Sequence, residues 1–354
     1  MRATWCGLLL ALSATLAGCG GDSARITIHA PEQSVAAFEN NRWTPIRMTD
    51  GVGELTPEGP FALAAVCGPF AQEGNPGGVH VVLGGPGDLI ETRSSCRPRL
   101  RDVDGQVDIV GTSNAVLMHV GERLPWAQAT GRSSLPPGRH DIVAFDNVSG
   151  RWAILHDVSV TEGFAIRLDF SSPAHMAERP GGSYFLLETK NGTVVYGSVV
   201  DSSIAADELV DGDRQTVIGL LSEPDPFGSE AFVRLDAGRD HPLGGVPAWT
   251  PHPVGDVRID GAGGRVEARW TSDAAWTTRT VTANVAGVRW HVEAHNGWDD
   301  GSATELRAPD LASHPAWDAS LSLRRGTSAF LELSERLDAH SEGVVRTGAN
   351  LPPP

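Results

Sequence analysis

Lysine is almost absent from this chain of 354 residues, in which Lys190 is the only one. A single lysine excludes most kinds of catalysis that depend on a lysine amine. Basic side chains as a whole are scarce, with 28 lysines and arginines against 44 acidic residues and a formal net charge of −16. Because nucleic-acid binding depends on basic side chains that neutralise phosphates, we expect no nucleic-acid partner.

Helical patterns and catalytic motifs are also missing. No segment repeats apolar residues at positions i, i+3, i+4 and i+7 over three turns, the spacing of an amphipathic helix. The chain contains neither Gly-x-Ser-x-Gly nor Ser-x-x-Lys, the motifs that present an activated serine. The glycine-rich stretch 84–87 has no Lys-Ser/Thr pair after it, so it predicts turns rather than a phosphate-binding loop. We therefore expect no enzyme and no cofactor.

The first nineteen residues have the layout of an export signal. Arg2 supplies a positive charge, residues 7–16 form an apolar run, and the residues directly before Cys19 are small. The apolar run is about ten residues long, too short for a hydrocarbon layer that needs roughly twenty. We predict that residues 1–18 are a signal peptide that is removed on export.

The quartet Leu16-Ala17-Gly18-Cys19 resembles the lipobox of bacterial lipoproteins at every position. The resemblance implies that the Cys19 thiol carries a diacylglycerol, that the chain is cut before Cys19, and that the new amino group receives a fatty acid such as palmitate. Several acyl chains attach a protein stably, since each buried CH₂ contributes about 0.8 kcal/mol. The implied location is the cell membrane or the outer membrane, periplasmic or surface-exposed. The alternative is an ordinary secretory signal followed by a cysteine that has no such role.

Cys67 and Cys96 are the two further cysteines of the mature chain, since Cys6 leaves with the signal. An even pair in an oxidising compartment predicts a disulfide. The enclosed loop of about thirty residues corresponds to a stabilisation of about 3–4 kcal/mol in the chain-entropy model. A reactive thiol or a metal pair is the alternative, but it lacks the Cys-x-x-Cys spacing.

Apolar and polar residues alternate along most of the chain, which is the period of a half-buried β-strand. Gly, Pro, Asn and Asp interrupt these runs, as turns require. The segment Lys190-Asn191-Gly192-Thr193 lies between two such runs and predicts a hairpin with a type I′ turn. We predict an all-β protein made of tandem antiparallel β-sandwich modules.

Two N-terminal stretches are similar to each other. A strand that begins at Ile26 is followed 29 positions later by Leu55 in a Leu-x-Pro turn, and Val107 is followed 28 positions later by Leu135 in a Leu-Pro-Pro turn. The pattern resembles the small β-sandwich modules of the carboxypeptidase-regulatory and PEGA families, which implies a stalk or spacer. We assign the two modules to residues 19–100 and 101–172, and an irregular β segment to residues 178–240.

The C-terminal third is rich in tryptophan, and its six short alternating segments resemble an immunoglobulin-like or fibronectin-like sandwich over residues 245–338. By alternation, Trp270 and Trp290 face the core of this module, which we expect to be independent. Residues 339–354 are polar and end in prolines, so they predict a disordered tail.

His291, Glu293 and His295 alternate along one predicted strand and therefore share one face. Two imidazoles and a carboxylate on one face can bind zinc. The opposite face is apolar, however, and a solvated polar face is the simpler interpretation. The acidic turns 102–105 and 299–301 lack the number and spacing of ligands in a calcium loop. We expect no metal ion.

Trp298 and Trp317 lie in predicted loops, where they either form a platform for sugar rings or cap the end of a core. The function that we expect is that of a lipid-anchored cell-envelope protein of structural, adhesion or scaffold type, whose partner is the membrane. The alternative is a carbohydrate- or peptide-binding lipoprotein that uses Trp298 and Trp317. The sequence identifies no protein or glycan partner.

Overall fold

The computed structural model describes residues 25–30, 35–49, 51–67, 78–88, 91–93, 101–121, 126–178, 183–197, 202–220, 230–285, 288–298, 304–323 and 328–350. The expected all-β fold is confirmed, because these residues form strands and short 3₁₀ turns without an α-helix. Among them, no helix has the length and apolarity that crossing a membrane requires. The signal segment, Cys19 and Cys96 lie outside the described residues.

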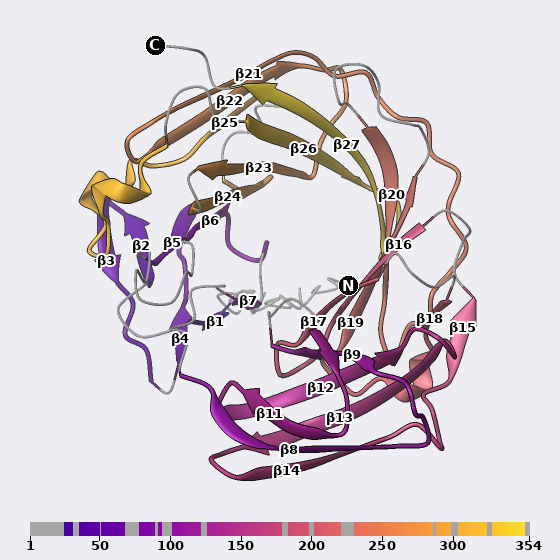
Figure 1. The fold of residues 1–354 in the computed structure, drawn as a ribbon. Helices are drawn as coiled ribbons and strands as arrows, with labels where there is room; N and C mark the ends of the chain where they lie inside the picture. The colour runs from indigo at the N-terminus through magenta and orange to yellow at the C-terminus, as the bar shows by residue number, and fades with distance from the viewer. Residues whose placement is uncertain are drawn as a thin grey trace, which may run out of the picture.

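One curved sheet of twelve strands runs through the molecule (Figure 1). In order across the sheet, its strands are β17 (Val194–Gly197), β16 (Ser183–Glu188), β19 (Arg214–Leu220), β20 (Glu230–Ala237), β27 (Ser341–Asn350), β26 (Ser328–Arg336), β23 (Thr278–Val285), β24 (Val288–His295), β6 (Gly78–Gly84), β5 (Phe61–Cys67), β2 (Val35–Glu39) and β3 (Arg42–Pro45). All neighbours in it are antiparallel except β24 and β6, which run parallel. The sheet therefore joins the N-terminal and C-terminal parts of the chain.

The two similar N-terminal stretches have the same strand topology. In the first, β4 (Val52–Leu55), β1 (Ile26–His29) and β7 (Glu91–Arg93) form one sheet, β3, β2, β5 and β6 follow one another in the large sheet, and apolar residues of β4 and β1 pack against β2, β5 and β6. In the second, β11 (Gly131–Leu135), β8 (Val103–Val110) and β14 (Phe164–Asp169) pack against β10 (Trp126–Gln128), β9 (Val116–Val120), β12 (Gly138–Asp146) and β13 (Arg151–Val160). Each three-stranded sheet contains one antiparallel and one parallel pair, in the same positions.

Strands β5 and β12 carry nearly continuous apolar runs because they are covered on both faces. In β5, Phe61 packs in one core with Ile26 of β1, whereas the next residue, Ala62, packs in another core with Trp290 of β24. The apolar residues of β12 alternate between two cores in the same way. A second layer on each side therefore explains why these strands lack polar alternation.

A three-stranded sheet covers the twelve-stranded sheet near its centre. It consists of β21 (Gly255–Ala262), β22 (Arg265–Thr271) and β25 (Glu305–Arg307), and two 3₁₀ turns complete the cover, η2 (Leu311–Ser313) and η3 (Ala319–Leu321). Trp270 is 3% exposed and Trp290 is 1% exposed in the core between these layers, so their predicted burial is confirmed. The indole Nε1 of Trp290 donates a hydrogen bond to the Leu321 carbonyl oxygen at 2.8 Å.

The C-terminal part differs from the expected independent sandwich over residues 245–338, because its main sheet continues on both sides. Strand β24 pairs with β6, and β27 lies between β20 and β26. The expectation of a disordered tail over 339–354 is wrong for residues 341–350, which form β27. Val344 and Val345 are buried there, so neighbouring strands supply the partners that composition alone does not show.

The segment 178–240 is also more regular than its composition suggests. It supplies four strands at one end of the twelve-stranded sheet, namely β16, β17, β19 and β20. Beside them, β15 (Met176–Glu178) pairs with β18 (Ser202–Ile204), and the 3₁₀ turn η1 (Ala206–Glu208) follows. Apolar residues of this end pack against β12 and β13 of the second unit.

The β16–β17 hairpin forms where the Asn-Gly pair predicts it, but the turn is not of type I′. That turn needs a positive φ at both central residues, and only Gly192 has one, at 77°. The carboxylate of Asp141 accepts hydrogen bonds from the Asn191 backbone N–H (3.2 Å) and side-chain Nδ2 (2.9 Å). These hydrogen bonds to Asp141 of β12 hold Asn191 in a conformation without the positive φ that a type I′ turn needs.

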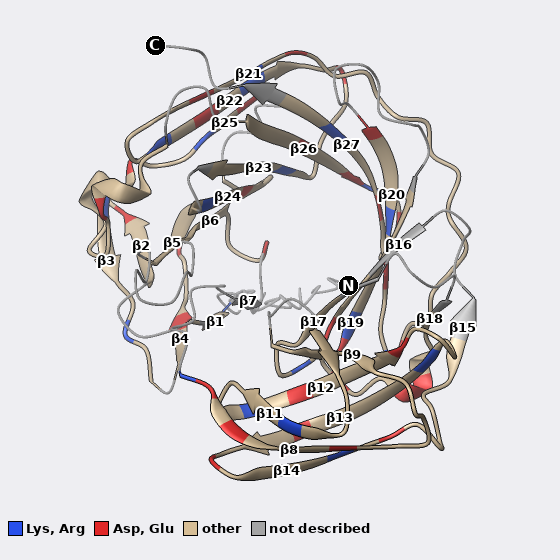
Figure 2. Cartoon of the chain, in the orientation of Figure 1, with Lys and Arg blue, Asp and Glu red and all other residues tan. Residues whose placement is uncertain are grey.

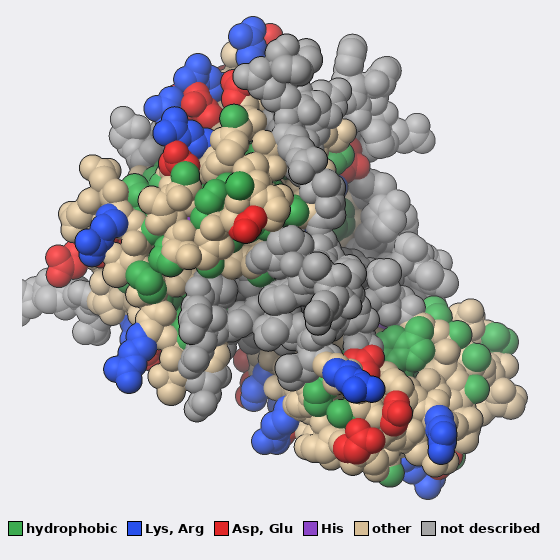
Figure 3. Space-filling view, turned by 60° about the vertical axis from the view of Figure 1, so that its left-hand side comes forward, with side chains coloured by type: hydrophobic (Ala, Val, Ile, Leu, Met, Phe, Trp, Pro, Cys, Tyr) green, Lys and Arg blue, Asp and Glu red, His purple; other side chains and the backbone are tan. Residues whose placement is uncertain are grey.

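Charged side chains of both signs are interspersed over the strands (Figure 2). The space-filling view likewise shows basic and acidic groups side by side (Figure 3). On the outer strands β22 and β25, Arg269 and Arg307 form ion pairs with Glu267 and Glu305. Because exposed ion pairs contribute only about 0–1 kcal/mol each, these pairs bear on solubility more than on the fold.

Candidate functional site

Strand β24 presents His291, Glu293 and His295 on one face of the twelve-stranded sheet, as the alternation predicts. The intervening side chains are buried on the other face, in the core with Trp290. The three polar side chains are half-buried rather than fully solvated. The cluster is therefore less exposed to solvent than the solvated polar face that the sequence predicts.

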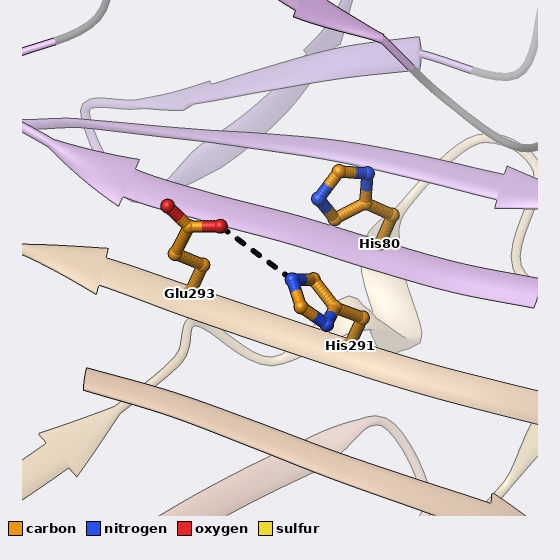
Figure 4. Close-up of side chains that lie close together, drawn as sticks. All are labelled: His80, His291 and Glu293. Atoms are coloured by element: carbon orange, nitrogen blue, oxygen red, sulfur yellow. Dashed lines mark hydrogen bonds and ion pairs between the residues drawn. The ribbon is translucent and has the colours of Figure 1, made fainter. Parts of the chain in front are cut away.

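His80 joins this group from β6. The parallel pairing places it directly beside His291, and the two rings lie 5.0 Å apart at an interplanar angle of 68° (Figure 4). One ligand atom from each of His80, His291 and Glu293 lies within 4.8 Å of the other two. Positions 80 and 291 are far apart in the sequence, and no local pattern around Gly78–Gly84 signals their contact.

Glu293 contacts both histidines of its own strand. Its Oε2 lies 3.5 Å from His291 Nε2, and its Oε1 lies 2.8 Å from His295 Nε2. The other ring nitrogen of His291, Nδ1, lies 3.3 Å from the Thr282 hydroxyl of β23. These contacts fix the orientation of His291 from two sides.

The carboxylate of Glu293 is held ionised by its neighbours. Burial acts to raise its pKa, but the hydrogen bonds and charges of His291 and His295 outweigh burial and lower the pKa well below the usual range. For His295, burial acts to lower the pKa, and the contact with Glu293 raises it above the ordinary value. The two shifts therefore favour an ionised Glu293 carboxylate beside a His295 ring that keeps its proton to higher pH.

The surroundings of the cluster change from apolar to ionic across the sheet. On the β5 side, buried Ala65 lies opposite His80. On the other side, beyond β23, Glu332 of β26 forms ion pairs with Arg234 and Arg346. These charges are paired with one another, although Glu342 of the same ionic network also raises the pKa of His295.

A second group of potential metal ligands joins the second unit to the loop after η1. It contains Asp141, His156 and Asp213. Asp141 is fully buried and accepts hydrogen bonds from the Asp157 N–H (2.7 Å) and from Asn191. Asp213 accepts hydrogen bonds from the backbone N–H groups of Lys190, in the β16–β17 hairpin, and Val210, in the loop after η1. Because backbone and amide donors occupy both carboxylates, this group is a structural polar core.

The tryptophans proposed as a sugar platform pack against the C-terminal core. The Trp317 ring meets the buried Trp290 edge-on, with centroids 5.8 Å apart, and Trp298 is half-buried against the same core. None of the tryptophans in the described part of the chain is exposed. The two side chains therefore act at least in part as caps of the core.

The remaining predicted site residues lie at the margin of the described structure. Cys67 ends β5, while Cys96 and the lipidation residue Cys19 lie outside the described residues. The whole acidic segment 299–301 lies outside them as well. The chain matches no protein-family model and no curated protein sequence.

Proposed function

We propose that this chain is a lipid-anchored protein of the bacterial cell envelope that acts as a structural, adhesion or scaffold component. The observation that carries the proposal is the quartet Leu16-Ala17-Gly18-Cys19 behind a short apolar run. Two or more acyl chains on Cys19 give stable attachment without a spanning helix. The all-β fold behind the anchor supports a role in which a rigid body is held at a membrane surface.

A non-catalytic role is supported by the chemistry of the chain. The sequence offers no serine nucleophile motif, and its single lysine excludes most lysine chemistry. The strongly acidic composition favours attachment through lipid over attachment through a basic patch, since basic patches are what anionic lipids attract. The candidate partners are accordingly the membrane, through the anchor, and an envelope component met by the β-surface.

The test is metabolic labelling of the full-length chain with an alkyne fatty acid in a bacterial host. The wild-type protein should carry the label and sediment with membranes, whereas Cys19→Ser should lose the label and appear in the soluble envelope fraction. Cys6→Ser is the matched control, because it alters a cysteine of the same signal segment and should keep the label. Label on the Cys19→Ser protein would contradict the proposal.

A glycan- or peptide-binding role for Trp298 and Trp317 is the alternative proposal, and burial weighs against it. A sugar platform needs aromatic faces open to solvent, and both rings are partly covered. Replacing each tryptophan by alanine separates the two roles. Loss of stability without loss of glycan or peptide binding indicates a core cap. Loss of binding without loss of stability indicates a binding platform.

A further inference from the structure

The histidine–glutamate cluster on β6 and β24 has the dimensions of a transition-metal site. Zinc binds histidine nitrogen and carboxylate oxygen at about 2.0–2.2 Å in a tetrahedron, so neighbouring ligand atoms lie about 3.4 Å apart. The distance from His291 Nε2 to Glu293 Oε2 is 3.5 Å. A nitrogen of His80 lies within 4.8 Å of one ligand atom of each of the other two residues, so a shift of about 1–1.5 Å would bring the three ligand atoms to the spacing of a tetrahedral zinc site.

The contacts around the cluster match those that orient metal ligands. A ligating histidine usually donates its second ring N–H to an oxygen, which fixes the tautomer. Thr282 Oγ1 stands at this position for His291, 3.3 Å from Nδ1. His295 lies 2.8 Å from the second carboxylate oxygen of Glu293 and holds the side chain in place. His291 Nδ1 and Glu293 Oε1, which would not contact the metal, therefore each have a polar partner that orients the side chain.

The cluster is also accessible. The side chains of His291 and Glu293 are 30% and 29% exposed, so an ion can enter from the solvent side of the sheet. Three protein ligands leave the fourth zinc position for a water molecule or for a ligand from solution. The apolar neighbour Ala65 on the adjacent strand strengthens the attraction between ion and ligands by excluding water on one side.

We propose that His80, His291 and Glu293 bind a zinc ion that links β6 of the N-terminal unit to β24 of the C-terminal part. The ion has two imidazole ligands and one carboxylate, and Thr282 and His295 act as positioning residues. Bound zinc stabilises the folded chain, because the unfolded chain does not hold residues 80 and 291 together. The proposal does not depend on lipid anchoring at Cys19.

The test is zinc binding by the complete chain without its signal peptide, with Cys19 replaced by serine. After removal of metal with a chelator, equilibrium dialysis against zinc should give a single ion per chain, and the thermal midpoint should rise with zinc but not with magnesium or calcium. Replacement by cobalt should give the visible absorption of a four-coordinate ion. A chain that binds no zinc contradicts the proposal.

Substitutions locate the ion. His291→Gln and His80→Gln should each abolish stoichiometric binding, whereas His295→Gln and Thr282→Val should weaken it about 10–100-fold, as loss of a ligand-orienting partner does. His156→Gln is the matched control, because it alters a histidine of the other polar group, and it should bind zinc as the wild type does. Binding that survives in both ligand variants, or that is lost in the control alone, overturns the assignment.

A measurement on the wild-type chain tests the proposal independently of whether the variants fold. Diethyl pyrocarbonate modifies imidazole nitrogens, so bound zinc should protect His80 and His291 in peptide mass spectra while exposed His175 stays reactive, its side chain being 74% exposed. Equal modification of His80 and His291 with and without zinc contradicts the proposal.

Discussion

Acid should loosen the contact between the C-terminal part and β5 through one buried histidine, His314. Its side chain is 4% exposed and lies edge-on to Trp43 at 5.3 Å. The Ala316 N–H donates to its Nδ1 at 3.1 Å, so this nitrogen carries no hydrogen. Its Nε2–H then donates to the Ala64 carbonyl oxygen at 3.1 Å. Protonation of Nδ1 would break the first bond and place a charge in the core.

The magnitude follows from the pKa of His314. Burial lowers the pKa from 6.5 to about 4, and the hydrogen bond to Ala64 opposes burial only in part. Between these pH values the unfolded chain binds a proton that the folded chain does not, so the free energy of unfolding falls as the pH falls through this window. At about 1.4 kcal/mol per pH unit, the interval corresponds to about 3 kcal/mol.

The assay compares wild type with His314→Gln, whose amide can donate to Ala64 and accept from Ala316 without titrating. The variant should be less stable at pH 7 because it loses the ring contact with Trp43. Towards pH 4, the difference in free energy of unfolding should shrink by about 3 kcal/mol. In the wild type, His314 takes up a proton in the unfolded chain but not in the folded one, whereas glutamine takes up no proton in either state. Buried His119, whose pKa burial also lowers to about 4, acts equally in both proteins and cancels.

Nuclear magnetic resonance of the His314 ring in the wild-type chain gives an independent check. Its imidazole signal should titrate near pH 4. A midpoint near 6.5, or a stability difference between the two proteins that does not change with pH, would refute the reasoning.

Further predictions concern the core and the cysteines. Trp290→Ala should destabilise the chain by about 3–5 kcal/mol, measured by urea denaturation, because this side chain is 1% exposed; an unchanged midpoint would contradict its burial. Cys67 and Cys96 should be joined in the exported protein, so thiol labelling under denaturing, non-reducing conditions should find neither, and two labelled thiols would disprove the bond. Trp298→Ala and Trp317→Ala should each lower the thermal midpoint, and Trp317→Ala more, since its ring contacts Trp290; unchanged midpoints would favour the binding platform.

In strands that alternate, such as β22 and β24, the sequence was enough to predict which face each residue occupies. It correctly placed Trp270 and Trp290 in the core and His291, Glu293 and His295 together on the opposite face. The period of two fixes this assignment locally, because it needs no information about the neighbouring strand.

The partner of each strand was not predictable in the same way. His80 meets His291 only because β6 and β24 pair in parallel, and no turn or spacing in the sequence records that pairing. The strand Ser341–Asn350 was missed for the same reason, since its polar composition becomes compatible with a strand only between β20 and β26. The sequence-based expectation of no metal ion considered three residues of β24 and did not include His80, which β6 places beside them.

The parallel pairing of β6 with β24 also affects the risk of aggregation while the chain is being synthesised. Until residues near position 295 exist, one edge of the apolar strand Gly78–Gly84 has no neighbour. At about 5–20 residues per second, that interval lasts roughly ten to forty seconds. A bare apolar edge is a template for pairing with other chains, so a holdase that covers this strand during synthesis would raise the share of protein that reaches the folded state.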